Sequence, residues 1–376
     1  MCLWGGYLTP AFEELIKQMP VTLTSIKSWL GRFSFTLGFL ALFIGWQLLD
    51  RRDPDVIYQL AGETMGTTYM VQVTGFPEGV DGDAVAQQVQ ELLLQVDNEW
   101  MSTYAPDSEI SRFNQSEPDL WFPVSLEVAQ LVQRALDLSV LTGGYFDITV
   151  GPLVNRWGFG PDQYQQGMPG ADEIRALREQ VGYQHVEVSL APPQLRKHRD
   201  VQLDLSAIAK GYGADVIADY FDRLAMDSYF VEIGGELRIR GVKPDGSSWV
   251  PAIEEPTEGS SRIHRALHTD GEPLALAGSG DYRNYFEQDG QRYSHEIDPF
   301  SGRPVTHDLV AVYVVADDAA TADALSTAFI VMGVDRALPL AESLGVGAYF
   351  ISKQTSEAGF DIVYSTRFAN YLEEAP

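Results

Sequence analysis

Residues 229–242 read YFVEIGGELRIRGV, two short stretches of alternating apolar and polar residues on either side of Gly234-Gly235. This alternation is typical of strands, and two glycines between such stretches are typical of a tight hairpin turn. A second turn of this kind is expected at Asp289-Gly290. Strands joined by short turns are antiparallel, so this pattern predicts an α+β fold with antiparallel or mixed sheets and packed helices rather than a doubly wound parallel sheet.

Strands and helices alternate on both sides of this hairpin. A strand pair is expected at 57–73, interrupted by a turn at Met65-Gly66-Thr67. Polar loops are expected at 158–170 and 254–272. Helical or strand-like spacing of apolar residues predicts helices at 83–98, 125–141, 172–181, 207–224, 319–332 and 335–344, and further strands at 185–190, 200–204, 249–253, 273–278, 284–287, 309–315, 347–351 and 360–365.

Composition limits the possible partners. The chain has 376 residues, with 26 Lys and Arg against 53 Asp and Glu, and its formal charge is −27. Residues 1–50 are balanced, so the whole excess belongs to residues 51–376. Such a charge disfavours nucleic acid as a partner, because a phosphate backbone would be repelled. Cys2 is the single cysteine of the sequence, which excludes a disulfide framework and a cysteine-based metal site.

An uncharged apolar stretch, FSFTLGFLALFIGWQLL, occupies residues 33–49. It is near the short limit for a membrane span, which needs about 20 residues. The residues after Leu49 lack the small-residue pattern of a signal-peptide cleavage site, which favours an uncleaved transmembrane anchor over a cleaved signal peptide. The orientation is poorly determined by charge, because basic residues lie on both sides of the stretch.

The chain is therefore expected to have four parts. The parts are an N-terminal segment at 1–32, the anchor at 33–49, a linker at 50–56 and one folded domain at 57–376. Within the N-terminal segment, Met19 is an alternative start of translation, since it would leave a short basic region before the apolar stretch.

The segment LDLSAIAKGYGAD, at 203–215, combines the end of an expected strand with the start of an expected helix. Free amides at a helix N-terminus attract phosphate, and Lys210 adds a positive charge. The P-loop pattern is absent, and an ordinary capped amphipathic helix remains an alternative. Further along, Asp323 and Thr327 are four residues apart on an expected helix, so their oxygens share one face and could hold Mg²⁺. The alternative is a solvated or capping pair.

His295 lies in YSHEIDP, at 293–299, beside an expected strand and a proline turn. It is a candidate for proton transfer or substrate positioning, or a structural histidine. The histidines show no zinc-binding spacing. Aromatic residues beside glycine turns, around Tyr104, Phe146 and Gly234-Gly235, suit a flat ligand such as a flavin, with core packing as the alternative.

Taken together and in this order, these segments resemble the ApbE-type FAD:protein FMN transferases. The resemblance covers residues from about 57 to 365, nearly the whole expected domain. Its segments are ETMGTTY (63–69), VDNEWMSTYAPDSEISRFN (96–114), GGYFDITVGPLVNRWGFG (143–160), LDLSAIAKGYGAD (203–215), VEIGGELRIRG (231–241), SGDYRNYFEQDGQRYSHEIDPFSGRP (279–304) and TADALSTA (321–328).

The resemblance implies an enzyme that binds FAD with Mg²⁺, cleaves the pyrophosphate, joins FMN through a phosphoester to a threonine of a partner flavoprotein, and releases AMP. Asp323 and Thr327, with the main-chain carbonyl of Ala207, would be the metal ligands. His295 would act in the transfer step, and Asp323 would be a catalytic residue as well as a metal ligand. The implied cofactor-binding residues are Met65, Tyr104, Phe146, Asp147, Asp204, Lys210, Gly234, Gly235 and Ile297.

Relatives in this family usually work outside the cytoplasm on subunits of membrane redox complexes. With the anchor at 33–49, this implies a protein of the inner membrane whose catalytic domain faces the periplasm. Two other functions stay open. One is an FAD pyrophosphatase that yields free FMN and AMP, and the other is a non-catalytic FAD-binding protein.

Overall fold

The computed structural model describes residues 56–160, 168–257, 262–282, 284–288, 290–354 and 359–372. The hairpin of residues 229–242 lies at the middle of its main sheet. Strands β6 (Tyr229–Ile233) and β7 (Glu236–Arg240) pair in antiparallel register across Gly234-Gly235. Both glycines have positive φ, +62° and +108°, a conformation that side chains disfavour.

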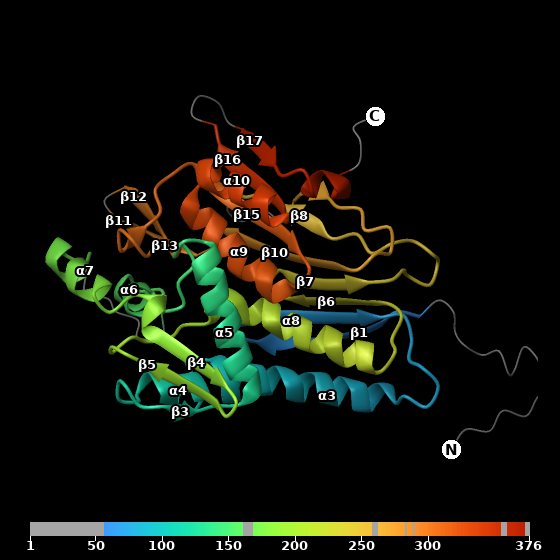
Figure 1. Cartoon of the computed structure of the whole chain (residues 1–376). Coiled ribbons are helices and arrows are strands. Elements are labelled where there is room, and N and C mark those ends of the chain that lie inside the picture. The colour runs from blue at the N-terminus through green and yellow to red at the C-terminus, as the bar shows by residue number, and fades with distance from the viewer. Residues whose placement is uncertain are drawn as a thin grey trace, which may run out of the picture. The chain divides into compact units, whose positions relative to one another are not determined.

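The main sheet has eight strands, and every neighbouring pair is antiparallel (Figure 1). The antiparallel α+β architecture predicted from the hairpins is confirmed. The turn at Met65-Gly66 joins the first two strands as expected. The spatial order is β1 (Tyr58–Thr64), β2 (Thr67–Val73), β6, β7, β10 (Leu274–Gly280), β15 (Leu309–Ala316), β16 (Gly347–Lys353) and β17 (Phe360–Tyr364).

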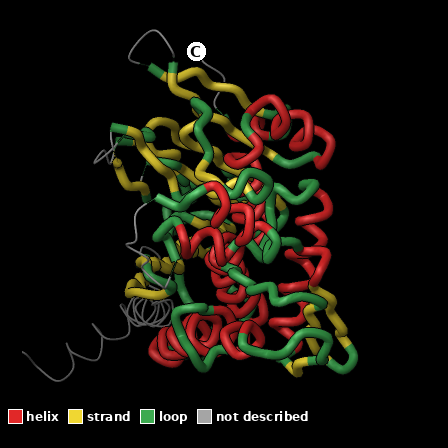
Figure 2. Tube along the Cα trace, turned by 90° about the vertical axis from the view of Figure 1, so that its left-hand side faces the viewer, coloured by secondary structure: helices red, strands yellow, loops and turns green. Residues whose placement is uncertain are grey.

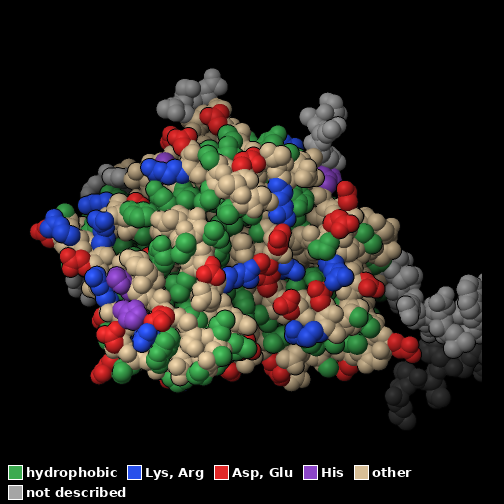
Figure 3. Space-filling model, in the orientation of Figure 1, with side chains coloured by type: hydrophobic (Ala, Val, Ile, Leu, Met, Phe, Trp, Pro, Cys, Tyr) green, Lys and Arg blue, Asp and Glu red, His purple; other side chains and the backbone are tan. Residues whose placement is uncertain are grey.

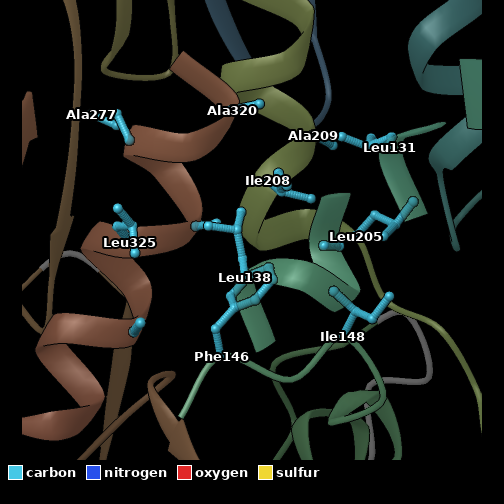
Figure 4. Close-up of a cluster of buried hydrophobic side chains, with 14 of the residues drawn as sticks. Leu131, Leu138, Phe146, Ile148, Leu205, Ile208, Ala209, Ala277, Ala320 and Leu325 are labelled. Carbon is cyan, nitrogen blue, oxygen red and sulfur yellow. The ribbon is translucent and has the colours of Figure 1, made fainter. Parts of the chain in front are cut away.

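Helices α8 (Ser206–Arg223) and α9 (Ala319–Met332) pack on one face of this sheet, and Figure 2 shows helices gathered to one side of the strands. The two helices touch closely, because a Cβ on Gly211 would lie 2.2 Å from the carbonyl oxygen of Ala319. Both helices are rich in alanine, whose small side chain lets backbones approach. Figure 4 draws side chains of the buried core around this pair, among them Ile208 and Leu325.

Shorter elements surround this centre. The other helical segments are α3 (Gly82–Leu94), the π-helical η1 (Gln95–Met101), α4 (Glu109–Asn114), α5 (Leu126–Leu141), α6 (Gly151–Arg156), α7 (Ala171–Arg178), η2 (Tyr183–His185), α10 (Val334–Leu344) and η3 (Phe368–Tyr371). The smaller sheets consist of β3 (Phe122–Pro123) with β5 (Pro193–Lys197) and β4 (Val186–Leu190), β8 (Ala252–Glu254) with β9 (Ile263–Ala266), β11 (Tyr285–Gln288) with β12 (Gln291–Ser294), and β13 (Ile297–Asp298) with β14 (Arg303–Pro304).

The strand predicted at 200–204 is wrong. Val201, Leu203 and Leu205 are buried in alternation, as a strand would bury them, but the segment joins no sheet. The side chain of Asn114 takes the place of a partner strand, since it accepts from the amide of Leu203 at 2.7 Å and donates to its carbonyl at 2.8 Å. The strand that pairs with β4 is β5, which begins at Pro193.

The loop predicted at 254–272 contains a strand, because β9 pairs with β8 within it. The short helices α4 and α6 were not predicted, since six residues are too few for a clear helical pattern. Helix α6 contributes Val154 to the cavity described below. On the face that Figure 3 shows, acidic and basic side chains are interspersed rather than separated into patches.

The predicted anchor at 33–49 and the alternative start at Met19 lie outside the described residues. Within the described part of the chain, no helix is long and apolar enough to cross a membrane.

Candidate active site

A cavity of about 790 Å³ lies where the first turns of α8 and one face of α9 meet the β1–β2 turn, η1 and the segment between β12 and β13. Its volume is within the usual range for small-molecule sites. Every site residue predicted from the sequence lines this cavity except Gly235, whose amide donates to Glu232 in the β6–β7 turn. The residues brought together are Met65, Tyr104, Phe146, Asp147, Asp204, Ala207, Lys210, Gly234, His295, Ile297, Asp323 and Thr327.

Three charged side chains form one group in the cavity wall, which we call the Lys210 cluster. The ammonium of Lys210 lies 2.8 Å from Oε1 of Glu236 and 3.5 Å from Oδ1 of Asp323. Glu236 and Asp323 are only 1% and 2% exposed. Gly234 permits this approach, because a Cβ there would lie 3.1 Å from Cδ of Lys210.

The charges within the Lys210 cluster control one another. Burial lowers the pKa of Lys210, but the carboxylates of Asp323 and Glu236 outweigh burial and raise it above its usual value. Burial, together with repulsion from Asp323, raises the pKa of Glu236 to about 8, against the attraction of Lys210. Two carboxylates and one ammonium sum to a charge of −1 when all are ionised. With a pKa of about 8, Glu236 is mostly protonated at neutral pH, and a cation bound in the wall would favour its ionised form.

The backbone of helix α8 also holds Asp323. Oδ2 of Asp323 accepts a hydrogen bond from the amide of Gly211 at 3.0 Å. In a regular helix this amide would donate to the carbonyl of Ala207. A carbonyl oxygen has two lone pairs, so the Ala207 carbonyl has capacity for another partner. One turn along α9, the hydroxyl of Thr327 lies 3.3 Å from that of Ser279, which also contacts Ser326 at 2.8 Å.

These donors fit Mg²⁺ by their chemistry. Within the described residues, no three acidic, histidine or cysteine side chains form a closed metal site. An ion here would combine the oxygens of Asp323, Thr327 and Ala207 with substrate phosphates, which is how Mg²⁺ is usually held. In addition, Oε2 of Glu236 is buried without a hydrogen-bond partner among the described residues. An orphaned carboxylate oxygen in the wall supports a cation nearby.

Met65 has φ +50°, an uncommon value for a residue with a side chain. Its amide donates to Oδ2 of Asp97 at 2.9 Å, and Asp97 comes from the π-helical segment η1. π-helical segments are frequent at functional sites. Asp97 thus fixes the strained turn at Met65, and the side chain of Met65 lines the cavity.

Asp147 and Asp204 shape the cavity through the backbone. Oδ1 of Asp147 accepts from the amide of Thr149 at 2.8 Å, Oδ2 accepts from the amide of Tyr183 at 3.0 Å, and burial raises the pKa of this carboxyl. Asp204 accepts from the amide of Ser206 at 2.9 Å, at the first residue of α8. Tyr104, in contrast, is 67% exposed at the cavity. Partial burial and the charge of Asp204 raise its pKa.

His295 is held by the segment that follows β12, here called the His295 segment (residues 295–299). Its Nδ1 lies 3.1 Å from the carbonyl oxygen of Asn284, and its Nε2 lies 3.4 Å from Oε1 of Glu296. The ring packs edge-on against Phe159, with 6.2 Å between centroids. Phe159 continues into an aromatic row through Phe286, Tyr293 and Trp157.

Sequence reasoning missed Glu236, Glu296, Asp97 and Ser279, which also line the cavity. All four lie within the segments of family resemblance, at 96–114, 231–241 and 279–304, which is the signal that could have found them. Their residue types alone do not reveal the role, because it depends on which distant segments they meet.

Comparison with known proteins agrees with this geometry. Residues 65–350 match the model of the ApbE family. The chain belongs to the ApbE family. It is 41% identical over 315 residues to the FAD:protein FMN transferase of Vibrio cholerae, covering 84% of this chain and 92% of that protein. It is 36% identical over 318 residues to the FAD:protein FMN transferase of Escherichia coli strain K12, covering 83% and 88%.

Solved structures of ApbE proteins share the fold. The flavin transferase ApbE from Vibrio cholerae matches with a TM-score of 0.77 and 39% identity, over 84% of this chain and 99% of that chain. The flavinyl transferase ApbE from Pseudomonas stutzeri, in its apo form, matches with a TM-score of 0.77 and 38% identity, over 86% and 98%. This ApbE chain therefore has relatives named as transferases along almost its whole described length.

Proposed function

We propose that this chain is an FAD:protein FMN transferase that moves FMN from FAD to a threonine hydroxyl of a partner flavoprotein, with Mg²⁺, and releases AMP. The names of the relatives support the transferase activity. The observation that carries the finer proposal is the Lys210 cluster, where an ammonium and two buried carboxylates line a cavity of sufficient size for a nucleotide. Phosphoryl transfer depends mainly on such positioning and charge.

In this proposal the first turns of α8 and one face of α9 hold the pyrophosphate. Lys210 contacts a phosphate oxygen directly. Asp323, Thr327 and the carbonyl of Ala207 would hold Mg²⁺, because they offer the hard oxygen donors that this ion prefers. When bound, Mg²⁺ would neutralise charge on the phosphates and stabilise the departing AMP. Glu236 keeps Lys210 beside Asp323.

His295 is proposed to handle the proton of the acceptor hydroxyl. Its Nδ1 faces the carbonyl of Asn284, and its Nε2, which lies 3.4 Å from Oε1 of Glu296, is the nitrogen that would meet the acceptor hydroxyl. General bases act through such a hydrogen-bond contact with the hydroxyl they deprotonate. The flavin and adenine would lie against Met65, Tyr104, Phe146 and Ile297. The turn at Gly234, and the backbone that Asp147 and Asp204 hold in place, would leave space for these rings.

The proposed location is the inner membrane, with residues 33–49 as the anchor and the catalytic domain in the periplasm, where subunits of membrane redox complexes would be the acceptors. The uncharged stretch in the sequence supports this. Alkaline-resistant membrane association and protease access from the periplasmic side would test it. Intact-mass analysis of the native protein would distinguish a start at Met1 from one at Met19.

One assay distinguishes the proposed activity from its alternatives. The full chain is incubated with FAD, Mg²⁺ and a candidate acceptor subunit from the same genome. An acceptor that becomes covalently fluorescent supports the transferase. Release of free FMN without modified acceptor indicates an FAD pyrophosphatase, and retention of intact FAD indicates a binding protein, so either result contradicts the proposal.

A further inference from the structure

A second cavity, of about 760 Å³, adjoins the β1–β2 turn, and we call it the β1 groove. Four of its lining residues, Met65, Gly66, Asp97 and Asn98, also line the cavity of the candidate active site. The rest of its lining comes from the β1–β2 hairpin within residues 61–69 and from the end of α3. The groove and the active-site cavity therefore meet at the turn.

Thr67 brings the β1 groove close to the Lys210 cluster. A Cβ on Gly234 would lie 2.8 Å from Cγ2 of Thr67 and 3.1 Å from Cδ of Lys210, so these two side chains flank the same glycine. Thr67 lines the groove, and Lys210 lines the active-site cavity. In the proposed function Lys210 contacts a phosphate of FAD, so a group that enters along the groove arrives beside that phosphate.

Strand β1 is the first strand of the main sheet, and within the described residues no strand pairs with its outer edge (Figure 1). The carbonyl of Thr68 accepts from the amide of Gly234 at 3.0 Å, so Thr68 faces β6 and forms a non-hydrogen-bonded pair with Glu63. The amide and carbonyl of Glu63 then point off the edge, and the period of two gives Ala61 and Gln59 the same direction. An edge of this kind is a template for another strand.

The lining of the β1 groove indicates which kind of segment fits it. Its two charged side chains, Glu63 and Asp97, are both acidic, and no Lys or Arg is among the lining residues. The groove therefore favours a segment with neutral or basic side chains. On the α3 side, Leu94 is 58% exposed and offers apolar surface to a bound chain.

We propose that the β1 groove is the docking site of the acceptor flavoprotein. An extended segment of the acceptor, with neutral or basic side chains, pairs with the outward backbone groups of Ala61 and Glu63 and rests against Leu94. Its threonine lies at the Met65-Gly66 turn, where the groove meets the active-site cavity. This inference rests on the proposed function, because it names how the acceptor of that reaction is held.

The first test removes the apolar contact. The probe is the acceptor subunit from the same genome that becomes fluorescent in the assay described above. In Leu94→Ser we expect the KM for this acceptor to rise about fivefold or more, while the KM for FAD stays unchanged. Leu141→Ser is the matched control, since Leu141 is also the last residue of a helix, is 52% exposed and lines neither cavity. It should leave both constants unaltered.

The second test blocks the strand edge. Ala61→Pro removes an amide that points off the edge, and it leaves the hydrogen bonds between β1 and β2 in place. We expect it to raise the KM for the acceptor about tenfold or more and to leave FAD retention unchanged. Gln59→Pro makes the same change two residues away, outside the groove lining, and should retain the original KM. Equal thermal unfolding midpoints show that both variants are folded.

A photoreactive amino acid in place of Gln90, which lines the β1 groove, identifies the occupant. Capture of the acceptor peptide that contains the modified threonine supports the proposal. Capture of residues 1–55 of the chain itself, or of a second copy, would overturn it, as would an unchanged acceptor KM in both Leu94→Ser and Ala61→Pro. In those cases transfer by the original chain still supports the transferase. If the original chain modifies no acceptor, the proposed function fails, and the docking site fails with it.

Discussion

The Lys210 cluster comes from α8, α9 and strand β7 of the main sheet, on which the two helices pack. The His295 segment follows the two-stranded hairpin β11–β12 and contains β13 of the short pair β13–β14. The helices are held by backbone-to-backbone contact at Gly211. The His295 ring is held by one main-chain carbonyl, one carboxylate and an aromatic row. Both meet in one cavity, yet the first belongs to the core and the second to its edge.

This difference separates two tasks. Binding a pyrophosphate needs charges that do not move, because misplaced charges lose most of their effect. Exchanging a proton with a second protein needs a group that the partner can reach, and His295 keeps about a third of its side chain exposed, 33%, while Asp323 keeps 3%. We therefore expect changes in the Lys210 cluster to abolish binding and transfer together. Changes around His295 should reduce transfer alone.

The largest effect is expected for Asp323→Ala. It removes the buried carboxylate that faces Lys210 and that would hold Mg²⁺, so transfer should fall by about 1000-fold or more. FAD retention, measured by flavin fluorescence after gel filtration, should weaken as well. Asp219→Ala, an exposed acidic residue on α8, is the matched control and should retain full activity. Transfer at the original rate in Asp323→Ala with Mg²⁺ present would refute the metal assignment.

A smaller effect, on stability, is expected for Gly211→Ala. The new Cβ would lie 2.2 Å from the carbonyl oxygen of Ala319, so α8 and α9 must separate, at a cost of about 3 kcal/mol in unfolding free energy. Gly213→Ala is the control on the same helix. Its Cβ would meet the flexible end of Met65 at 2.9 Å, and we expect a clearly smaller loss by urea denaturation. Equal losses in the two variants would show that the close helix contact does not set the rigidity of the Lys210 cluster.

Some of this arrangement follows from the sequence because it is local. The spacing of Asp323 and Thr327 places both on one face of a helix, and the glycine turns define the hairpins that order the sheet. The α+β fold and the family resemblance follow from such features. The residues that complete the site do not, because Glu236 becomes a cavity residue only when β7 meets α8.

The wrongly predicted strand at 200–204 also shows that a local pattern does not determine long-range pairing. Its alternating burial is present, but the predicted strand is wrong, because the segment joins no sheet. Whether an extended segment joins a sheet depends on a partner far along the chain, and here the side chain of Asn114 satisfies Leu203 instead. Local pattern determines conformation, whereas pairing is decided by the tertiary fold.

The smallest effect is expected for Phe286→Leu. Phe286 does not line the cavity, but its ring lies 5.6 Å from that of Phe159, which packs on His295. Loss of an aromatic pair costs about 0.5–1.5 kcal/mol, so the rate at saturating FAD should fall by at most about two- to thirteenfold while the KM for FAD stays unchanged. Phe230→Leu, which removes a comparable ring contact with Trp249 on the main sheet, should leave the rate unaltered. A rise in KM for Phe286→Leu would mean that the hairpin supports FAD binding as well, and the division between the two regions would then be false.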